Sequence, residues 1–315
     1  MYCFRRSLLA RTSLLLLAVS LLASDFSALA CTLWSLSGER VQGGGTLIAK
    51  NRDFTTDMPN HFEVIAPENG YRAFAMVATS AEGKRNMVGG VNEHGLAVVT
   101  ATVGTIPKQE RISRSRAGKL QNPTRAILTR FRSLRELLDN PEALRMLYPV
   151  FALVADSTGA VMIEASGGDY RILPVASGES GVHTNHPLSR DFPDIWETKA
   201  ATGSMVRLDR MRGLLDQSPG RLGLGAFTAL SLDRDGGPDQ SVFRTGSAPG
   251  KPRTLGTLAA WLPPVGAPVV FARLTNDGQG VEEKTFTLDA TFWRKAPEPG
   301  RVRVLLRDGT TPVRP

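Results

Sequence analysis

Short runs of apolar and β-branched residues recur along the chain, separated by polar or glycine-containing segments. Runs of this length between turn residues are typical of β-strands. The short spacing between successive runs favours antiparallel pairing, because such strands can be joined by direct turns. The predicted strands are 32–37, 46–50, 61–66, 73–79, 87–91, 96–103, 150–155, 160–165, 170–175, 255–262, 269–274 and 284–288.

Helical periodicity lies between the two groups of strands. Asn122 and Pro123 are typical of a helix start, and apolar residues within 127–138 then recur at helical spacing. The polar segment 106–121 is rich in Arg, Ser and Lys and is predicted to be an exposed loop. Strand-rich segments that flank helical ones predict a layered α+β architecture. Further helices are predicted from Pro141, over 205–215 and over 227–232.

The first thirty residues have the pattern of a secretory signal. Arginines precede an apolar run at 14–23, and the small residues Ala28 and Ala30 follow it. The run is too short to span a bilayer comfortably, and no later stretch of that length is free of charge. We therefore expect signal-peptide cleavage after Ala30 and export to the periplasm or the medium. The mature chain, 31–315, would have 315 − 30 = 285 residues and is predicted to be one domain, because no long linker or repeat divides it.

Composition narrows the classes of function. A hydrophobic content of 42% is enough for a sizeable core, and the net charge of +8 comes from scattered basic residues. The chain has no arginine-rich arm or aromatic-interleaved basic strip, which excludes nucleic acid as the predicted partner. His183 and His186 are close in sequence, but the pattern of a zinc enzyme is missing. We predict no metal, no cofactor and no stable membrane span.

Cysteine usage points to the chemistry. The chain contains Cys3 and Cys31, and cleavage after Ala30 would leave Cys31 as the first residue and the only cysteine of the mature protein. A thiol titrates near pH 8.5 and an α-amine near pH 8, so the two groups can serve as nucleophile and base on one residue. The alternative is a non-catalytic envelope lipoprotein, in which lipid would block the sulfur and the amine of Cys31.

Local patterns then match a known group in the same order along the chain. The chain resembles the N-terminal nucleophile hydrolases of the choloylglycine hydrolase and penicillin acylase group, together with their acyltransferase relatives. The patterns are Cys31-Thr32, the Asn-x-Asp-aromatic turn at Asn51–Phe54, the Asn-Glu-x-Gly-Leu type strand ending at Asn92–Leu96, the Thr-Asn turn at Thr184–Asn185, and a late arginine strand at Ser241–Arg244.

The resemblance implies a four-layer αββα sandwich with two antiparallel sheets, in which Cys31 begins a strand of a central sheet. It implies that Cys31 is the nucleophile and that its own amine is the base. Asp53 would hold that amine, Asn185 would donate its side-chain N–H to the oxyanion, and Arg244 would support the site electrostatically. A backbone N–H near Thr102 would complete the oxyanion site.

The chain departs from many bile-salt hydrolases at Lys50, where they have Arg, and at Thr102, where they have Asn. Both departures favour the acyltransferase-like or penicillin-acylase-like branches. We predict an exported amidohydrolase that cleaves linear amides of small N-acyl compounds through a thioester acyl-enzyme; the same site would transfer the acyl group if an amine replaced water. Trp34 and Phe54 are predicted to be core aromatics, with an acyl pocket as the alternative. The resemblance leaves both a monomer and a homo-oligomer open.

Overall fold

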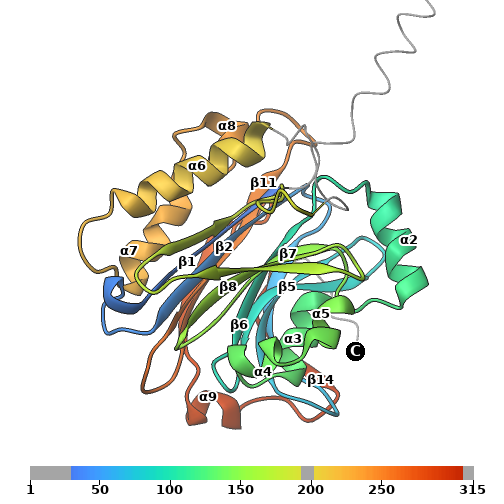
Figure 1. Ribbon diagram of the computed structural model, residues 1–315, viewed down its shortest axis with the longest axis vertical. Helices are drawn as coiled ribbons and strands as arrows, with labels where there is room; N and C mark the ends of the chain where they lie inside the picture. Colours follow the sequence, from blue (N-terminus) through green and yellow to red (C-terminus); the bar gives the residue numbers. More distant parts are fainter. Residues whose placement is uncertain (1–29, 193–201, 308–315) are drawn as a thin grey trace, which may run out of the picture.

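The computed structural model describes residues 30–192 and 202–307. Two antiparallel sheets stack on one another, and helices cover their outer faces (Figure 1). This arrangement confirms the predicted αββα sandwich of the α+β class. Residues 1–29 of the predicted signal peptide lie outside the described ones, and Ala30 begins the first described strand. No helix in the described part of the chain is long and apolar enough to cross a bilayer.

The six-stranded sheet carries Cys31. Its strands, in spatial order, are β10 (Ser180–His183), β1 (Ala30–Ser37), β2 (Thr46–Phe54), β11 (Arg253–Leu262), β12 (Val269–Leu274) and β13 (Glu282–Thr287). Glycines with positive φ at 43–45 make the turn between β1 and β2. A Cβ on Gly45 would lie 2.1 Å from the carbonyl oxygen of Leu262, so only glycine fits there. This turn fixes a register in which Cys31 is opposite Arg52.

The eight-stranded sheet packs against the inner face of the six-stranded sheet, and its strands follow one another in nearly sequential order. Its strands, in spatial order, are β14 (Arg301–Arg307), β3 (Asn60–Ala66), β4 (Ala73–Thr79), β5 (Arg85–Asn92), β6 (Ala97–Thr102), β7 (Val150–Asp156), β8 (Gly159–Ala165) and β9 (Tyr170–Val175). The sequence predicted the inner strands well, because each is a run of buried apolar residues. It missed β10, which has four residues, and β14.

The helices form the outer layers and the rims. They are α2 (Lys108–Gly118), α3 (Pro123–Arg130), α4 (Leu134–Leu138), α5 (Pro141–Arg145), α6 (Thr202–Asp216), α7 (Leu224–Ala229), α8 (Gly237–Gln240) and α9 (Ala290–Arg294), with 3₁₀ turns at Gly38–Arg40 and Leu230–Leu232. The predicted cap at Asn122 is confirmed, since its side chain accepts the Arg125 N–H. The apolar stretch 127–138 is split between α3 and α4, because the chain is extended at Phe131.

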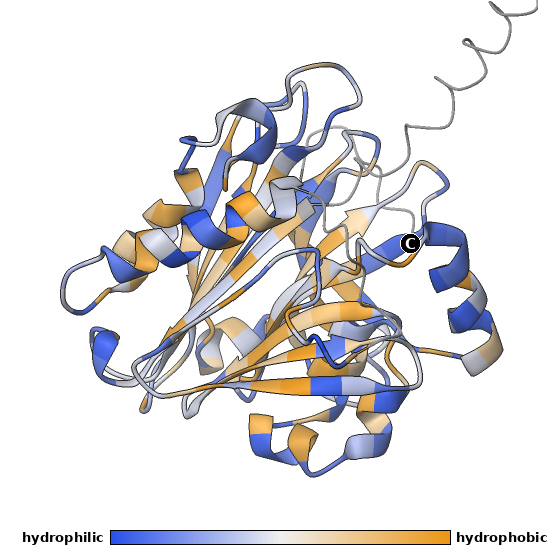
Figure 2. Cartoon of the chain, turned by 45° about the horizontal axis from the view of Figure 1, so that its top comes forward, coloured by the Kyte–Doolittle hydropathy of each residue, from blue (hydrophilic) through white to orange (hydrophobic). Residues whose placement is uncertain are grey.

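Three apolar clusters fill the spaces between the layers. One lies between the sheets and includes Cys31, Leu33 and Ile48. The second packs the eight-stranded sheet against α3, α4 and α5, and the third packs the six-stranded sheet against α6 and α7. Figure 2 shows the matching distribution of hydropathy, with hydrophobic residues along the strands and hydrophilic ones on the loops and outer helix faces. Cys31 therefore points into the central layer.

The prediction of an exposed loop over 106–121 is wrong, because most of this segment forms α2. The helix is largely hydrophilic, as Figure 2 shows, so it lacks the apolar stripe by which a helix is recognised from sequence. An ion pair between Glu110 and Arg114 supports it from one turn to the next. The guanidinium of Arg111 is buried and donates to the backbone oxygens of Val103 and Ile106. These polar contacts, rather than apolar packing, attach α2 to the rest of the chain.

Candidate active site

Cys31 lies near the start of β1 and is 7% exposed. Its side chain belongs to the cluster between the two sheets, and its thiol is free. The sulfur is 4.0 Å from the backbone oxygen of Asp53. In the sheet, Cys31 is paired with Arg52 of β2, so the two side chains leave the sheet on the same face.

Asn185 connects Cys31 to the other sheet. Its Oδ1 accepts the backbone N–H of Cys31 at 2.7 Å, and its Nδ2 donates to the backbone oxygen of Thr102 at 2.9 Å. The Asn185 amide has N–H donors on one side and a carbonyl on the other, so its oxygen must face the donors and its NH₂ group the carbonyl. The structure thus brings Cys31, Asn185 and Thr102 together. One hydrogen of Nδ2 is used by Thr102, and the second remains to donate elsewhere.

Asp53 lies on the other face of β2 and is fully buried. Its Oδ1 accepts the hydroxyl of Thr254 at 2.7 Å, while its Oδ2 has no hydrogen-bond partner among the described residues. Burial raises the pKa of this carboxyl to about 6, although the charges of Arg244 and Arg207 oppose the shift. The nitrogen of Cys31 is bonded to Asn185 and not to Asp53. In the strand register, the residue opposite Asp53 is Ala30.

Two of the predicted motifs have a different local structure from the one expected. The segment Asn51–Phe54 is part of β2 and not a turn, and Ser241–Arg244 is irregular chain between α8 and β11 and not a strand. β2 continues to Phe54 because it pairs with β1 on one side and β11 on the other. Asn51 donates to the backbone oxygens of Ser231 and Val242, which holds the irregular segment beside β2. Arg244 is anchored by its backbone N–H to the Thr254 hydroxyl, at 2.8 Å.

Arg207 belongs to the same cluster, and the sequence did not single it out. It comes from α6, is 2% exposed, and donates from Nη2 to Asn185 Oδ1 at 3.1 Å. Burial lowers its pKa to about 10, and Asp53 opposes that shift. An arginine on a basic amphipathic helix is usually expected to face solvent. Its spacing from Ser204, Met211 and Leu215 puts Arg207 on the buried face, and that spacing was the available signal.

Lys50 lies between the sheets, on the same face of the six-stranded sheet as Cys31, and contacts the eight-stranded sheet. It is 1% exposed, and its ammonium donates to the backbone oxygen of Val88 at 2.9 Å and to that of Thr100. Burial lowers its pKa to about 8, while the Cys31 thiol, as an anion, would raise it. Lys50 and Arg52 share one face of β2 with Cys31.

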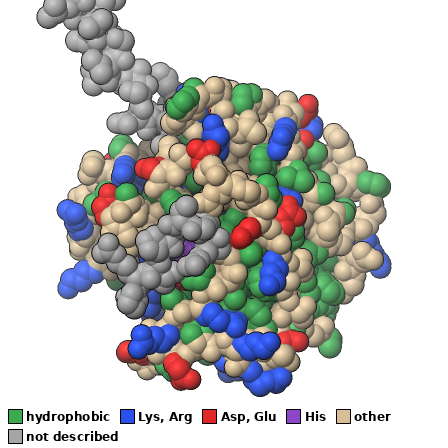
Figure 3. Space-filling model, turned by 180° about the vertical axis from the view of Figure 1, so that it is seen from behind, with side chains coloured by type: hydrophobic (Ala, Val, Ile, Leu, Met, Phe, Trp, Pro, Cys, Tyr) green, Lys and Arg blue, Asp and Glu red, His purple; other side chains and the backbone are tan. Residues whose placement is uncertain are grey.

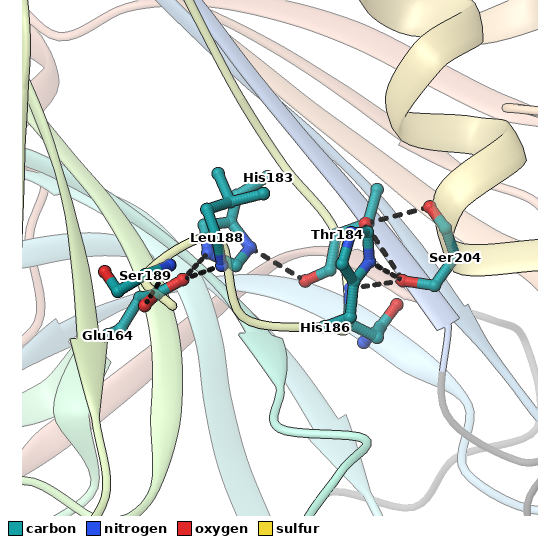
Figure 4. Close-up of polar contacts among 8 residues, drawn as sticks. Glu164, His183, Thr184, His186, Leu188, Ser189 and Ser204 are labelled. Carbon is teal, nitrogen blue, oxygen red and sulfur yellow. Dashed lines mark hydrogen bonds and ion pairs between the residues drawn. The ribbon is translucent and has the colours of Figure 1, made fainter. Parts of the chain in front are cut away.

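A hydrogen-bond network positions the segment after β10 that carries Asn185 (Figure 4). His183 lies between Glu164 of β8, at 2.9 Å from Nε2, and the backbone oxygen of Thr184, at 3.1 Å from Nδ1. Glu164 also accepts the N–H groups of Leu188 and Ser189. Burial raises the pKa of Glu164, but the contacts from His183 and these N–H groups outweigh it and keep the pKa below its ordinary value.

The second half of this network lies beside α6. The backbone N–H of Asn185 donates to Ser204 Oγ at 2.9 Å, and Ser204 donates to Thr184 Oγ1 at the same distance. His186 Nδ1 is 2.8 Å from Ser204 Oγ (Figure 4). Burial lowers the pKa of His186 to about 4, so its ring is neutral at pH 7. His183 and His186 therefore act in the structure as hydrogen-bonding groups around Asn185.

Comparison with known proteins adds to this geometry. The profile of the acyl-coenzyme A:6-aminopenicillanic acid acyl-transferase family matches residues 40–273, which is more than half of the chain. The chain belongs to this acyl-transferase family. The family prediction made from the sequence motifs is therefore confirmed. The match begins after Cys31, so it does not by itself assign a role to that residue. A search of curated proteins finds no match.

Solved structures agree on the fold. A mutant of the conjugated bile acid hydrolase from Clostridium perfringens has a TM-score of 0.53 at 12% identity, over 90% of this chain and 99% of that one. Penicillin V acylase from Agrobacterium tumefaciens has a TM-score of 0.52 at 14% identity, over 87% and 91%. At these identities the likeness concerns the fold, which is the one that the acyl-transferase family membership predicts.

The aromatic residues near the motifs have different surroundings. Trp34 is fully buried on the helix-facing side of the six-stranded sheet, with its ring 5.9 Å from that of Phe227. It is a core residue, as predicted, and faces away from the Cys31 side of the sheet. Phe54 is on the Cys31 side, and the guanidinium of Arg52 lies 4.3 Å from its ring centre. Of the two, Phe54 is therefore the one placed to contribute to an acyl-binding site.

Proposed function

We propose that this acyl-transferase family member is an exported amidohydrolase with Cys31 as its N-terminal nucleophile. The observation that carries the proposal is the position of Asn185, which contacts the Cys31 nitrogen and the end of β6 at once. A nucleophile, a side-chain donor and the backbone near Thr102 therefore meet where the two sheets face each other. The substrates would be small N-acyl compounds with linear amide bonds.

The proposed reaction begins when cleavage after Ala30 turns the Cys31 peptide nitrogen into an α-amine. This amine takes the thiol proton, and the sulfur attacks the acyl carbonyl carbon. The second N–H of Asn185 and a backbone N–H near Thr102 stabilise the tetrahedral oxyanion. The Cys31 ammonium then protonates the leaving nitrogen as the C–N bond breaks, which leaves a thioester. Water attacks the thioester, releases the acid and restores the thiol.

The buried cations support the thiolate in this scheme. Lys50 and Arg52 share the face of β2 on which Cys31 points, and Arg207 acts on Asn185. Oriented positive charges in a buried site stabilise an anion more strongly than water-exposed ones do. The Lys50 and Thr102 departures are compatible with this role, because Lys50 keeps a buried positive charge and the Thr102 backbone reaches Asn185.

Acyl transfer is the second candidate, and the family profile favours it. The acyl-enzyme would be the same, with an amine attacking the thioester in place of water. The ratio of acid to amide product at increasing amine concentration separates the two outcomes. Figure 3 shows basic side chains on several parts of one face of the molecule, with a group of them at its lower edge.

The decisive experiment combines mass and activity. Intact mass and N-terminal sequencing of the exported protein should show a free Cys31 amine; a lipid-modified Cys31 would favour the lipoprotein alternative and refute the enzyme. Cys31→Ala and Cys31→Ser should both lose hydrolysis of a panel of N-acyl amides, by at least about three orders of magnitude for the alanine variant. Met205→Ala, at an exposed position of α6, is the control and should keep full activity. Unchanged hydrolysis in both Cys31 variants would overturn the proposal.

A further inference from the structure

Buried positive charge exceeds buried negative charge around Cys31. Lys50, Arg52, Arg207 and Arg244 are all less than one-tenth exposed, and Asp53 is the buried carboxylate beside them. Isolated buried charges are costly, so proteins pair them or leave them for a ligand. Ionisation of Cys31 would balance one further cation. An excess of positive charge remains, which suits an anionic group on the substrate.

The four cations differ in what they already bind. Lys50 donates to two backbone oxygens, and Arg207 donates to Asn185. Arg244 acts mainly on Asp53, on the other face of the sheet. Arg52 shares the Cys31 face of β2, forms no ion pair with any described residue, and its Nη1 is buried without an acceptor. Arg207 and Arg244 each have a buried Nε without an acceptor as well, but both act on Asp53, on the other face of β2. The guanidinium of Arg52 is therefore the cation that is open to a ligand on the Cys31 side.

The surroundings of Arg52 hold it ready for such a ligand. The guanidinium is fixed over the ring of Phe54, with 4.3 Å between the Cζ atom and the ring centre. Stacking uses the flat face of the group and leaves its N–H edge free to bind a planar anion through two hydrogen bonds. Burial lowers the pKa of Arg52 to about 10, so the positive charge persists at neutral pH.

We propose that Arg52 is a specificity-determining residue that binds a carboxylate of the substrate. The inference rests on the proposed function, because it uses the position of Cys31 as nucleophile. Directly opposed residues on antiparallel strands have Cβ atoms about 5 Å apart, which limits the distance between the reacting carbonyl and the carboxylate to a few bonds. Two kinds of substrate meet this condition: N-acyl amino acids, with the carboxylate on the amine side, and monoamides of dicarboxylic acids, with it on the acyl side.

The test uses pairs of substrates that differ only in the carboxylate. N-phenylacetylglycine is compared with N-phenylacetylglycinamide, and glutaryl p-nitroanilide with pentanoyl p-nitroanilide. The measured quantity is the ratio of kcat/KM between the charged and the neutral member of each pair. In Arg52→Gln this ratio should fall by about tenfold to a hundredfold for at least one pair, since a charged hydrogen-bond pair is lost. In Arg52→Lys the ratio should lie between those of the parent protein and Arg52→Gln, because a lysine keeps the charge and loses the bidentate geometry.

Arg135→Gln is the matched control, since the Arg135 side chain on α4 is 91% exposed. Its ratios should equal those of the parent protein. The pair that responds to Arg52→Gln identifies the side of the amide that carries the carboxylate. If neither ratio changes by more than about twofold in Arg52→Gln, the inference is wrong, because a lost charged hydrogen bond costs more than that. Phe54→Leu keeps Arg52 but removes its stacking partner, so it provides the same test, with a smaller fall in the ratio, should Arg52→Gln fail to fold.

A binding measurement separates this inference from the proposed function. If the parent protein shows no Cys31-dependent hydrolysis of any substrate, the proposed function is refuted, but the inference about Arg52 is not. The thermal shift of the Cys31→Ala protein is then measured with N-phenylacetylglycine and with its amide. A larger shift with the carboxylate, abolished by adding Arg52→Gln, supports an anion site at Arg52. Equal shifts with both compounds overturn it.

Discussion

Glu164→Gln is the perturbation that tests most directly how the candidate site is held. Glu164 is fully buried in β8 and accepts hydrogen bonds from His183 and from the N–H groups of Leu188 and Ser189. Glutamine has nearly the same shape, but it replaces one carboxylate oxygen with an NH₂ group. That group would face N–H donors, so at least one of these contacts becomes a repulsion between donors.

The magnitude follows from burial. Removing one partner of a buried charged pair destabilises a protein by about 3–5 kcal/mol. Because glutamine keeps one acceptor, we expect Glu164→Gln to lower the free energy of unfolding by about 3 kcal/mol. For chains of this size 1 kcal/mol corresponds to about 2–4 °C, which predicts a Tm lower by about 6–12 °C. Because His183 also contacts the Thr184 carbonyl, next to Asn185, kcat should fall more than KM rises.

Urea unfolding followed by circular dichroism measures the first quantity, and steady-state kinetics on one N-acyl amide measures the second. Glu142→Gln on α5 is the control, because its side chain is 83% exposed; it should change stability by less than about 0.5 kcal/mol. A loss below about 1 kcal/mol in Glu164→Gln would refute the reasoning, since the pair would then contribute no more than a surface contact.

Three further predictions address single contacts. In the folded chain with Ala30 still attached, the pKa of Asp53 is about 6, above its ordinary value of 3.8. The stability of this chain should therefore fall as pH rises from about 4 to 6, by about 3 kcal/mol measured by urea unfolding. Asp53→Asn should remove this decline, and a decline of the same size in that variant would contradict the assignment. Asn185→Leu should lower kcat by about 10²–10³-fold through loss of an oxyanion donor, and kinetics within about tenfold of the parent would contradict it. Asn122→Ala should destabilise the chain by about 1 kcal/mol in thermal unfolding because it removes the α3 cap, whereas an unchanged Tm would show that the cap contributes nothing.

Where hydrophobic pattern alone decides structure, the sequence was a good guide to the fold. The runs at 73–79 and 170–175 coincide with β4 and β9, because buried and half-buried strands keep a pattern of apolar residues. Polar contacts were invisible to the same reasoning. The helix α2 is held by Arg111 and an ion pair, and buried Asn51 holds the segment around Val242 beside β2. Neither feature has an apolar signature.

The candidate site was predicted in part for a similar reason. The family motifs located Cys31, Asp53 and Asn185, which the structure places around the end of β2. The cations were harder to find. Arg52 and Arg207 lie within basic segments, where a positive charge is usually solvated, and only the tertiary structure shows that both are buried. Sequence patterns identify residues that a family shares, whereas pairing between distant segments decides which charges lose their water.

The contacts of Asp53 and Cys31 suggest why cleavage and activity would be coupled. With Ala30 attached, Cys31 has one N–H, which Asn185 occupies, and Ala30 lies opposite Asp53 in the sheet. Asp53 Oδ2 is left without a hydrogen bond among the described residues, and burial raises its pKa. Removal of Ala30 would turn the single donor into an amine with additional N–H groups, which could then donate to that carboxylate. An opposite charge near a carboxyl lowers its pKa, so this contact would keep Asp53 ionised and orient the amine. The same buried carboxylate that is unfavourable in the precursor would then position the base in the enzyme.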